Sequence, residues 1–453
     1  VDVSNHVYCY SFMQKHDWPH FHSTQEVLLE YFNECANHFG IRDDIRFSTE
    51  VSSAVWDEDS GRWVLELAGE DGEETFICHS IVSAVGQLNR PSYPDIDGRD
   101  SFKGPSWHSA RWNHEEKIEG KNIAVIGTGC SAIQFIPRVA EEAASTTIFQ
   151  RTPNWLMPRP QYQKELPQNL LWCFDHIPFY NNWFRLHLFW RSHEGLLPRL
   201  EVDPEWDGNE DNSVSASNHE LGFMLRLYLE SEFNDDPELL EKVTPRYTMG
   251  AKRFVIDDGL WATTLKRPDV TLCTDHIAEI TETGLLTEDG TLYEAEAIIY
   301  GTGFKASEFL TPMKIVGRGG IDLHEQWDGV AQAYLGIVSP NFPNLFFMYG
   351  PNTNIVINGS IIYFSECETH YISRYIQYLL ENDITALDVK KEVHDEYNVR
   401  INEGNSQMAW GASSVSSWYK NPDGKITQNW PFSLLEYWQQ TREINPNDYI
   451  ELE

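Results

Sequence analysis

The segment from residue 121 to 143, KNIAVIGTGCSAIQFIPRVAEEA, constrains the fold most, because it reads as a strand, a glycine turn and a helix. Gly127, Gly129 and Ala132 follow the pattern G-x-G-x-x-A between the strand and the helix. The first glycine allows a tight turn, the second lets a pyrophosphate approach the backbone, and the small third residue lets helix and strand pack closely. The segment predicts a dinucleotide-binding unit whose phosphates meet the helix N-terminus. A tight β–α connection without a ligand is the alternative.

The residues after the next apolar strand, TTIFQ, indicate which dinucleotide this unit binds. Proteins that bind NAD place an Asp or Glu about 20 residues after the turn, whereas this chain has Arg151 and Thr152. A guanidinium matches a 2′-phosphate bidentately, so we expect NADPH and not NADH. Lys252 and Arg253 form a second pair of cations in the segment GAKRFVIDDG. The alternative for that pair is a solvated surface.

The charge of the chain limits its partners. Its 453 residues carry a formal net charge of −35, which argues against nucleic acid and anionic membranes, since both need a basic surface. An apolar content of 41% predicts a globular protein. The seven cysteines include no C-x-x-C pair. We therefore expect free thiols, a reducing cytoplasmic location and no metal site.

The most apolar stretch, from residue 170 to 190, raises the question of membrane contact. It contains Asp175, Pro178 and Arg185, and no run of 18 apolar residues occurs in the chain. We therefore expect a buried or cleft-lining helical insert and no membrane span.

The pattern along the chain predicts an α/β organisation with an interruption. Residues 23–39 read as an amphipathic helix that begins with a capping box of Ser23 and Glu26. Proline and glycine cluster over residues 90–105, which indicates a connection between domains. Residues 153–250 are aromatic-rich, acidic and mostly helical in pattern, and the β pattern returns from residue 270.

The segment FKGPSWHSARW contains Phe102, Gly104, His108 and Trp112 at fixed offsets. This pattern, Phe-x-Gly-x-x-x-His-x-x-x-Trp, arises by chance at roughly one start position in 10⁵. It resembles the fingerprint of the type I Baeyer–Villiger monooxygenases. Further matching segments follow in the order of that family: VSAVGQLNRPSYPDIDG, IGTGCSAIQ, FQRTPNW, AKRFVIDDG, IIYGTGF, YGPNTN and SSWYKNP. The segments GPNTNIVINGS and NWPFSLLEYWQQTR look most like the 4-hydroxyacetophenone monooxygenase subgroup.

The resemblance covers essentially the whole chain and implies an α/β fold of two dinucleotide-binding, Rossmann-like domains. The NADP domain is inserted into the FAD domain and carries a mostly helical insert. We expect residues 1–105 to be the first part of the FAD domain, 106–290 the NADP domain with its insert at about 155–250, and 291–453 the rest. The family's first G-x-G-x-x-G is absent here, so we expect an N-terminal truncation on the order of 50 residues or more. Whether the chain alone holds FAD stays open.

The resemblance also implies a reaction: an NADPH- and O2-dependent conversion of ketones, expected to be aryl ketones, to esters or lactones through a C4a-peroxyflavin. Arg253 resembles the family's active-site arginine, which acts as a permanent charge because its pKa is too high for it to lose a proton. Asp2 resembles the carboxylate that pairs with this arginine, and its alternative is a capping or turn aspartate.

The resemblance assigns further residues. Trp418 resembles a tryptophan that closes on the cofactor, with a core tryptophan as the alternative. Cys130 is interpreted as a small helix-entry residue and His108 as part of a hinge for domain rotation, where Phe102 and Trp112 pack between the domains and Gly104 lets the backbone turn. The expected flavin contacts are Tyr8, Val51, Gly86, Gly301, Thr302 and Gly303. The expected NADP contacts are Gly127, Gly129, Ser131, Ala132, Gln134, Arg151, Thr152, Lys252 and Trp418.

Two rival functions remain open at this point. The first is an N- or S-oxygenating flavin monooxygenase with the same cofactors. The second is a non-catalytic NADP-binding fragment that lacks FAD. The expected partners are a small ketone and O2, and a homodimer is left open.

Overall fold

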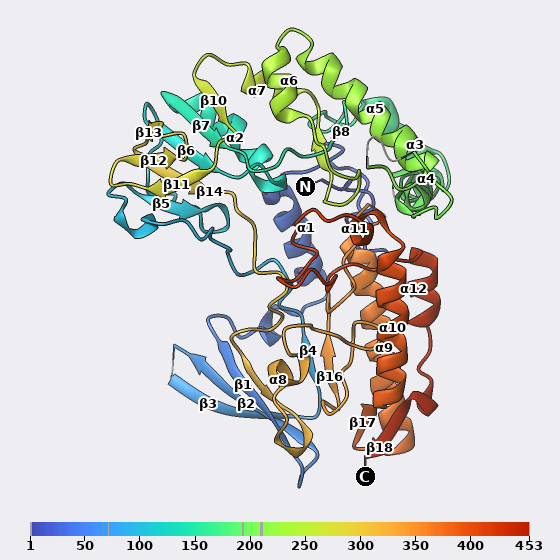
Figure 1. The fold of residues 1–453 in the computed structure, drawn as a ribbon. Helices are drawn as coiled ribbons and strands as arrows, with labels where there is room; N and C mark the ends of the chain where they lie inside the picture. Colours follow the sequence, from blue (N-terminus) through green and yellow to red (C-terminus); the bar gives the residue numbers. More distant parts are fainter. Residues whose placement is uncertain (1, 71, 193, 209–211, 358, 453) are drawn as a thin grey trace.

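The chain folds into two lobes, with helix α1 (Gln25–His38) between them (Figure 1). The computed structural model describes residues 2–70, 72–192, 194–208, 212–357 and 359–452. The upper lobe in Figure 1 holds a five-stranded sheet and a group of helices, and the lower lobe holds smaller sheets beside long helices.

The five-stranded sheet is parallel throughout, in the order β10-β7-β6-β14-β5. Helix α2 (Cys130–Glu142) follows β6, so the predicted strand, glycine turn and helix are present. This arrangement matches the doubly wound sheets that bind dinucleotides at the carboxyl ends of their strands. The strands are β5 (Ser106–His108), β6 (Asn122–Ile126), β7 (Ser145–Phe149), β10 (Val270–Cys273) and β14 (Ala297–Tyr300).

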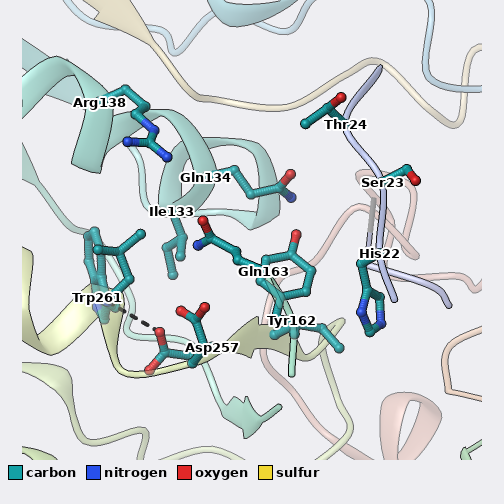
Figure 2. A pocket seen from close by; sticks show the side chains of 13 residues that line it. His22, Ser23, Thr24, Ile133, Gln134, Arg138, Tyr162, Gln163, Asp257 and Trp261 are labelled. Carbon is teal, nitrogen blue, oxygen red and sulfur yellow. Dashed lines mark hydrogen bonds between the residues drawn. The ribbon is translucent and has the colours of Figure 1, made fainter. Parts of the chain in front are cut away.

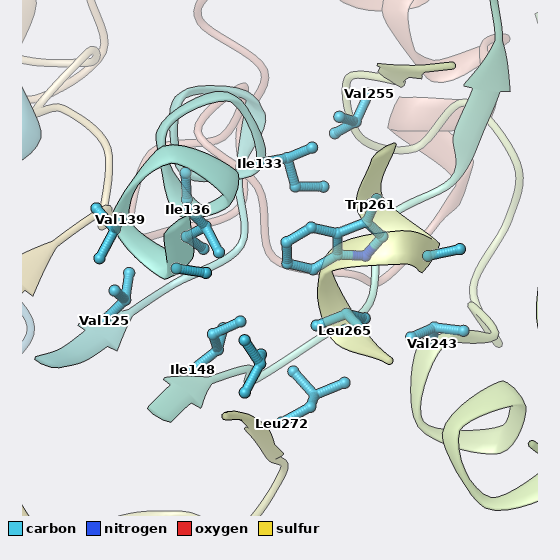
Figure 3. Close-up of a cluster of buried hydrophobic side chains, with 14 of the residues drawn as sticks. Val125, Ile133, Ile136, Val139, Ile148, Val243, Val255, Trp261, Leu265 and Leu272 are labelled. Carbon is cyan, nitrogen blue, oxygen red and sulfur yellow. The ribbon is translucent and has the colours of Figure 1, made fainter. Parts of the chain in front are cut away.

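The core of this sheet forms because its strands are apolar on both faces. All four residues of β14 are buried, as are the last four of β6, which is typical of parallel sheets covered on both sides. Figure 3 shows one of the covering layers, in which the indole of Trp261 from α7 (Leu260–Leu265) lies among Ile133, Ile136 and Leu265. The other layer includes a three-stranded sheet of β11 (Ile277–Ile280), β12 (Gly284–Thr287) and β13 (Leu292–Glu294).

Strand pairing in the lower lobe shows that the upper sheet is an insertion. Strand β1 (Glu50–Asp57) pairs in parallel with β15 (Lys314–Val316), and β4 (Ile81–Ser83) pairs in parallel with β16 (Leu345–Phe347). Both partners come after the chain has completed β14, so the chain leaves the lower lobe and returns to it. The predicted insertion of one unit into another is confirmed. The upper sheet extends past residue 290, where the sequence placed its end, because β14 pairs with β6 and β5.

The remaining elements complete the two lobes. Strands β2 (Arg62–Gly69) and β3 (Gly72–Cys78) extend the sheet of β1. Long helices cover one side of the lower lobe (Figure 1). The remaining helices and strands after β14 are α8 (Leu323–Trp327), α9 (Ile361–Asn382), α10 (Lys391–Ser406), α11 (Ala409–Ala412), α12 (Leu434–Gln440), and the antiparallel pair β17 (Ala386–Val389) and β18 (Tyr449–Leu452). Short 3-10 helices are η1 (Arg42–Asp44), η2 (Arg99–Ser101), η3 (Ser109–Arg111), η4 (Glu194–Leu200), η6 (Arg318–Gly320) and η7 (Pro446–Asp448).

The helical insert lies between two strands that pair with each other, β8 (Leu156–Pro158) and β9 (Val255–Asp257). Its helices are α3 (Gln168–His176), α4 (Tyr180–Ser192), α5 (Ala216–Phe233) and α6 (Pro237–Val243). The expectation that residues 170–190 are buried or line a cleft is wrong for one side of this stretch. Phe174 is buried, but Phe179 and Trp183 are exposed, because α3 and α4 lie at the edge of the upper lobe (Figure 1).

Three smaller expectations can also be compared with the structure. The capping box at the start of α1 is wrong: the N-cap is Thr24 without a side-chain cap, and the hydroxyl of Ser23 accepts a hydrogen bond from Asn5. All seven cysteines are free thiols, as expected. Among the helices that the structure describes, none is both long enough and apolar enough to cross a bilayer.

Candidate functional site

The glycine turn after β6 is shaped by a second glycine turn that packs against it. Gly127 has a φ of +102°, and a Cβ placed on it would lie 2.5 Å from the carbonyl oxygen of Gly301. A Cβ on Gly301 would in turn lie 2.9 Å from the Cβ of Ala132. Gly129 differs, because a Cβ there would meet no protein atom within 4 Å. The first and third positions of the motif are therefore small for packing, and the second leaves open space of the kind that a pyrophosphate needs.

Two contacts fix the entry to α2. The side-chain amide of Asn154 donates to the carbonyl oxygen of Thr128 at 2.5 Å. The thiol of Cys130, the first residue of α2, donates to the carbonyl oxygen of Phe254 at 3.7 Å. Burial raises the pKa of the Cys130 thiol to about 11, so the thiol stays protonated at neutral pH. This fits its interpretation as a helix-entry residue.

Arg253 and Asp2 form an ion pair at the same end of α2. The Nε and Nη2 atoms of Arg253 donate to Oδ2 of Asp2 at 3.0 and 2.7 Å, and Nη1 donates to the carbonyl oxygen of Ile355 at 3.3 Å. The two side chains are 28% and 22% exposed. Arg253 also interacts with the side chain of Cys130, the first residue of α2, so the guanidinium lies at the N-terminus of α2 and does not point into bulk solvent.

The ion pair fixes the charge of both partners. Burial alone would raise the pKa of Asp2, but the charge and the hydrogen bonds of Arg253 outweigh it and lower the pKa below its usual value. The negative charge of Asp2 raises the pKa of Arg253 against the effect of burial. Arg253 is therefore a permanent cation whose direction is set by Asp2 and by the carbonyl of Ile355.

The segment that carries Asp2 is anchored by Asn5, which is fully buried. Its side-chain amide donates to the carbonyl oxygen of His20 at 2.8 Å and to the hydroxyl of Ser23 at 2.6 Å, and its side-chain oxygen accepts from the amide of Ser23 at 2.9 Å. Tyr8 lies on the same segment, where burial and the charge of Asp2 raise the pKa of its hydroxyl.

Arg151 and Lys252 come close enough for their charges to interact, as the sequence predicts. Burial, and next the charge of Arg151, lower the pKa of Lys252 to about 8. The ammonium group of Lys252 lies 5.1 Å from the ring centroid of Tyr247. Within the part of the chain that the structure describes, no carboxylate lies within 4.0 Å of either cation. Two close cations without a counter-ion suit a phosphate, and Thr152 follows Arg151 directly.

The second glycine turn, Gly301 to Gly303, is tied to the connection between the lobes. The hydroxyl of Thr302 donates to the carbonyl oxygen of Ser92 at 2.5 Å, and the amide of Ser92 donates to the carbonyl oxygen of Gly303 at 2.9 Å. Gly303 has a φ of +81°, and a Cβ there would meet nothing within 4 Å. This is a second place where a ligand can approach the backbone closely.

Gly86 marks a third open position, in the lower lobe. Its φ is +72°, with open space where a Cβ would lie. The next residue, Gln87, donates from its side-chain amide to the carbonyl oxygens of Tyr349 at 3.0 Å and Gly350 at 3.2 Å. Exposed apolar side chains, Val82 and Val85, stand beside it. These features fit a flat apolar cofactor that also has phosphates. Val51, also expected to contact the flavin, lies on β1 and packs on the cluster that includes Phe347 and Trp327.

The loop after α11 reaches the ion pair. Trp418 is partly buried and its ring lies 4.7 Å from that of Tyr419. Tyr419 is fully buried, and burial raises the pKa of its hydroxyl while the positive charge of Arg253 opposes the shift. Trp418 is therefore the neighbour in sequence of Tyr419, whose side chain interacts electrostatically with Arg253.

The fingerprint around His108 has a packing explanation. A Cβ on Gly104 would lie 2.5 Å from the carbonyl oxygen of Glu296 and 2.7 Å from the ring of Phe102. His108 is fully buried, accepts a hydrogen bond from the amide of Ala110 at 3.1 Å, and faces Phe304 of the second glycine turn with ring centroids 5.6 Å apart. Burial lowers its pKa, which fits a structural role.

Phe102 and Trp112 do not pack between the two lobes, where the sequence analysis placed them. Phe102 joins the cluster beneath the three-stranded sheet. Trp112 packs against Trp107 and Phe135 at centroid distances of 5.9 and 5.4 Å, on the side of α2. Both clusters belong to the upper lobe, because the motif runs into β5 at the edge of that sheet.

A cavity of about 200 Å³ lies beside α2 (Figure 2). Tyr162 lines it, and burial, followed by the negative charge of Asp2, raises the pKa of that tyrosine. Asp257 is held there by the hydroxyl of Tyr228 at 2.7 Å and the amide of Trp261 at 3.2 Å. The lining residues are His22, Ser23, Thr24, Ile133, Gln134, Arg138, Tyr162, Gln163, Ile256, Asp257, Asp258, Leu260 and Trp261.

Of the residues assigned from the sequence, only Gln134 lines this cavity; its amide donates to the carbonyl oxygen of Cys130 at 2.9 Å. Ser131 is exposed in the first turn of α2. The sequence analysis missed Tyr162, because nothing in the loop PRPQYQ marks it.

Glu368 was also missed, although α9 carried a signal for it. It is fully buried among apolar neighbours on that helix, and its carboxylate accepts from the amide of Tyr349 at 3.1 Å. Burial raises its pKa to about 8. A single charged residue on the apolar face of a helix is the pattern that predicts such a group.

Known proteins are similar to nearly the whole chain, and a family model matches its first part. The family model described as flavin-binding monooxygenase-like matches residues 1–186. The FAD-binding monooxygenase ktnD of Aspergillus niger is 35% identical over 460 residues, which cover 99% of this chain and 73% of that protein. A Baeyer–Villiger monooxygenase of Streptomyces coelicolor is 32% identical over 451 residues, which cover 99% of this chain and 82% of the other.

Solved structures extend the similarity to the fold. A cyclohexanone monooxygenase from Rhodococcus sp. Phi1 bound to NADP+ superimposes with a TM-score of 0.85 at 26% identity, covering 100% of this chain and 90% of that one. An oxidised steroid monooxygenase bound to NADP gives a TM-score of 0.82 at 27% identity, with the same coverage. The similarity therefore includes both lobes and is not confined to the glycine turn.

Proposed function

The chain belongs to the flavin-binding monooxygenase-like family, and we propose that it converts aryl ketones to esters or lactones with NADPH and O2. At the coarser level it is an FAD-dependent monooxygenase of the Baeyer–Villiger type that uses NADP. We propose in addition that the substrate is an aryl ketone and that the chain belongs to the 4-hydroxyacetophenone monooxygenase subgroup. The observation that carries it is the permanent cation Arg253, paired with Asp2 at the N-terminus of α2.

The residues present fit NADPH and the part of the FAD site that lies around Gly86 and Gly303. The open backbone at Gly129 and the N-terminus of α2 would hold the pyrophosphate of NADPH, while Arg151 and Lys252 would hold its 2′-phosphate. The left-handed glycines Gly86 and Gly303, both with open space, would let FAD approach the backbone. Bound FAD supplies the electron transfer and oxygen activation that amino-acid side chains lack.

The chain's own contribution is a fixed, largely buried positive charge. Negative charge develops on the carbonyl oxygen of a ketone when a nucleophile adds to it, and an oriented guanidinium stabilises that charge without reorganising. Asp2 and the carbonyl of Ile355 hold Arg253 in one direction, so its charge is already oriented before the reaction. Tyr419, from the C-terminal loop, lies close enough to Arg253 for their charges to interact, and Trp418 packs against Tyr419.

The cavity beside α2 supports an aromatic substrate. Tyr162 and Trp261 contribute aromatic surface to it, and Gln134 and Gln163 contribute amides that can bind a phenol or a carbonyl. Figure 2 shows these amides on the side of Tyr162 that faces α2. An aryl ketone with a polar ring substituent suits that combination of groups.

The test is a product assay on the full chain supplied with FAD, NADPH and O2. We expect 4-hydroxyacetophenone to give an acetate ester, and a thioether offered in parallel to give less sulfoxide. If cyclohexanone gave a lactone and the aryl ketone gave no ester, the proposed substrate class would be refuted, but the proposed Baeyer–Villiger reaction would still stand. Sulfoxide without ester from any ketone would favour an S-oxygenating monooxygenase instead.

A further inference from the structure

Helix α4 is apolar on two sides but is covered on only one. Its inner side carries Phe184, whose ring lies 5.2 Å from that of Phe174, and Phe189, whose ring lies 5.7 Å from that of Tyr363. A helix that is apolar all round is usually buried all round. The outer side of α4 therefore needs an explanation that the oxygenation chemistry does not provide.

The outer side forms one continuous stripe. Phe179, Trp183, Leu186 and Trp190 are 74%, 68%, 50% and 63% exposed. We call these four residues the α4 stripe. Trp172 and Ile177, from the end of α3 and the turn before α4, are exposed as well. Figure 1 places both helices at the edge of the upper lobe.

The spacing and size of the stripe suit a second helix. Trp183, Leu186 and Trp190 follow one another at intervals of three and four residues within α4, which is the a/d spacing by which two helices interlock their side chains, and Phe179 directly precedes the helix. With side chains of this size, the six residues expose about 700 Å² in total. That is close to the roughly 800 Å² per partner of a standard protein interface, and it exceeds what monomers usually leave open as one apolar patch.

The charge pattern favours a second copy of this chain as the partner. The chain has a net charge of −35, so two copies repel each other over most of their surfaces. Residues 177–191 contain no aspartate or glutamate. A two-fold symmetric contact needs a patch that is complementary to itself, and an apolar stripe without carboxylates meets that requirement. Interface cores are similarly rich in tryptophan and phenylalanine and poor in charge.

A membrane surface fits the stripe less well. Helices that lie on membranes carry many lysines and arginines on their polar side, whereas α4 has only Arg185 and Arg191. The guanidinium of Arg185 is turned inward, where it donates to the thiol of Cys9 at 3.0 Å. The net charge of the chain also opposes anionic lipids.

We propose that the α4 stripe is a homodimer interface, in which α4 of one copy packs against α4 of a second copy. Trp183 and Trp190 are the central contacts, because large aromatic side chains dominate the binding energy of such interfaces. The interface lies outside the candidate active site and does not depend on the proposed reaction.

Light scattering after size exclusion tests this on the 453-residue chain, whose mass is 52.4 kDa. We expect twice that mass for the wild type at micromolar concentration. Trp183→Glu should weaken the dimer by roughly 30-fold or more and give a monomer. Leu380→Glu is the matched control, since Leu380 is 78% exposed on α9 as an isolated apolar residue, and this variant should remain a dimer.

A measurement on the wild type covers the case in which Trp183→Glu fails to fold. Backbone amides of residues 180–191 should exchange with deuterium more slowly at high than at low protein concentration, whereas those of α9 should not change. A monomeric wild type, or a dimer whose α4 exchange does not depend on concentration, would overturn the proposal. So would a monomer that floats with phosphatidylcholine vesicles, because the stripe would then be a lipid contact.

Discussion

The candidate NADP site at the glycine turn of the upper lobe and the candidate FAD site around Gly86 of the lower lobe differ in how the chain brings their residues together. The strand, glycines and helix of the turn between β6 and α2 follow directly within residues 122–142, and Gly301 packs against the finished turn. Gly86 instead stands beside Tyr349 and Gly350, which reach it only because β4 pairs with β16 across the whole insertion. A local site can be recognised from its sequence motif, whereas a site assembled by strand pairing needs the structure.

Replacing Gly127 by alanine should destabilise the glycine turn of the upper lobe more than any other change considered. The new Cβ would lie 2.5 Å from the carbonyl oxygen of Gly301 at a φ of +102°, so clash and backbone strain add. We expect a loss of about 3 kcal/mol or more in the free energy of unfolding, measured by urea titration. Gly303→Ala, with a φ of +81° but open space, should cost only about 1 kcal/mol. Equal costs would show that the two turns do not pack as described.

Replacing Gly129 by alanine separates binding from folding. Its Cβ meets no protein atom within 4 Å, and glycine is not required by its φ of −67°. We expect an unfolding free energy within about 0.5 kcal/mol of the wild type but an NADP+ dissociation constant about 10 to 100 times higher, measured by calorimetry. Unchanged affinity would mean that the pyrophosphate does not lie against this residue.

Lys252→Met tests the cation pair of the upper lobe. We expect the KM for NADPH to rise about 10-fold or more, because a charge-assisted hydrogen bond to the 2′-phosphate is lost, while the KM for NADH stays the same. Since the pKa of Lys252 is lowered to about 8, NADP+ affinity of the wild type should fall as pH rises through that value. The variant should lack this step. A parallel rise in the KM for NADH would point to a general effect on the turn.

Glu368→Gln tests the buried carboxyl group that accepts a hydrogen bond from Tyr349, beside Gly86 in the lower lobe. The expected effect is the smallest of the four. The pKa of Glu368 is raised to about 8, so between its unfolded value and pH 8 the folded chain keeps a proton that the unfolded chain releases. Stability from this group is therefore lost as pH rises across that window. The variant keeps an acceptor for the amide of Tyr349 but has no proton to lose. Its melting temperature should depend less on pH between 5 and 8, by a few degrees; an unchanged dependence would contradict the burial of this carboxyl group.

Much of the upper lobe could be predicted because its sequence is locally consistent. Apolar strands, glycines at required positions and a helix follow one another from 121 to 143, and the cations at 151 and 252 come together as expected. The role of Gly104 could not be predicted, because it depends on the carbonyl of Glu296, far along the chain. The sequence could not reveal the exposed side of α4 either, since an apolar helix reads the same whether one side or both sides are covered. Tyr162 and the anchor Asn5 stand in irregular segments without any motif.

The central claim is that two neighbouring residues have different roles: Lys252 binds the nucleotide and Arg253 stabilises the reacting oxygen. The most direct measurement compares Lys252→Met and Arg253→Met for nucleotide affinity and for ester formed per second at saturating NADPH. The account predicts that Arg253→Met keeps its NADP+ affinity within a few-fold and loses about 1,000-fold in ester formation, whereas Lys252→Met loses affinity and retains turnover. Ester formation by Arg253→Met within 10-fold of the wild type would contradict it.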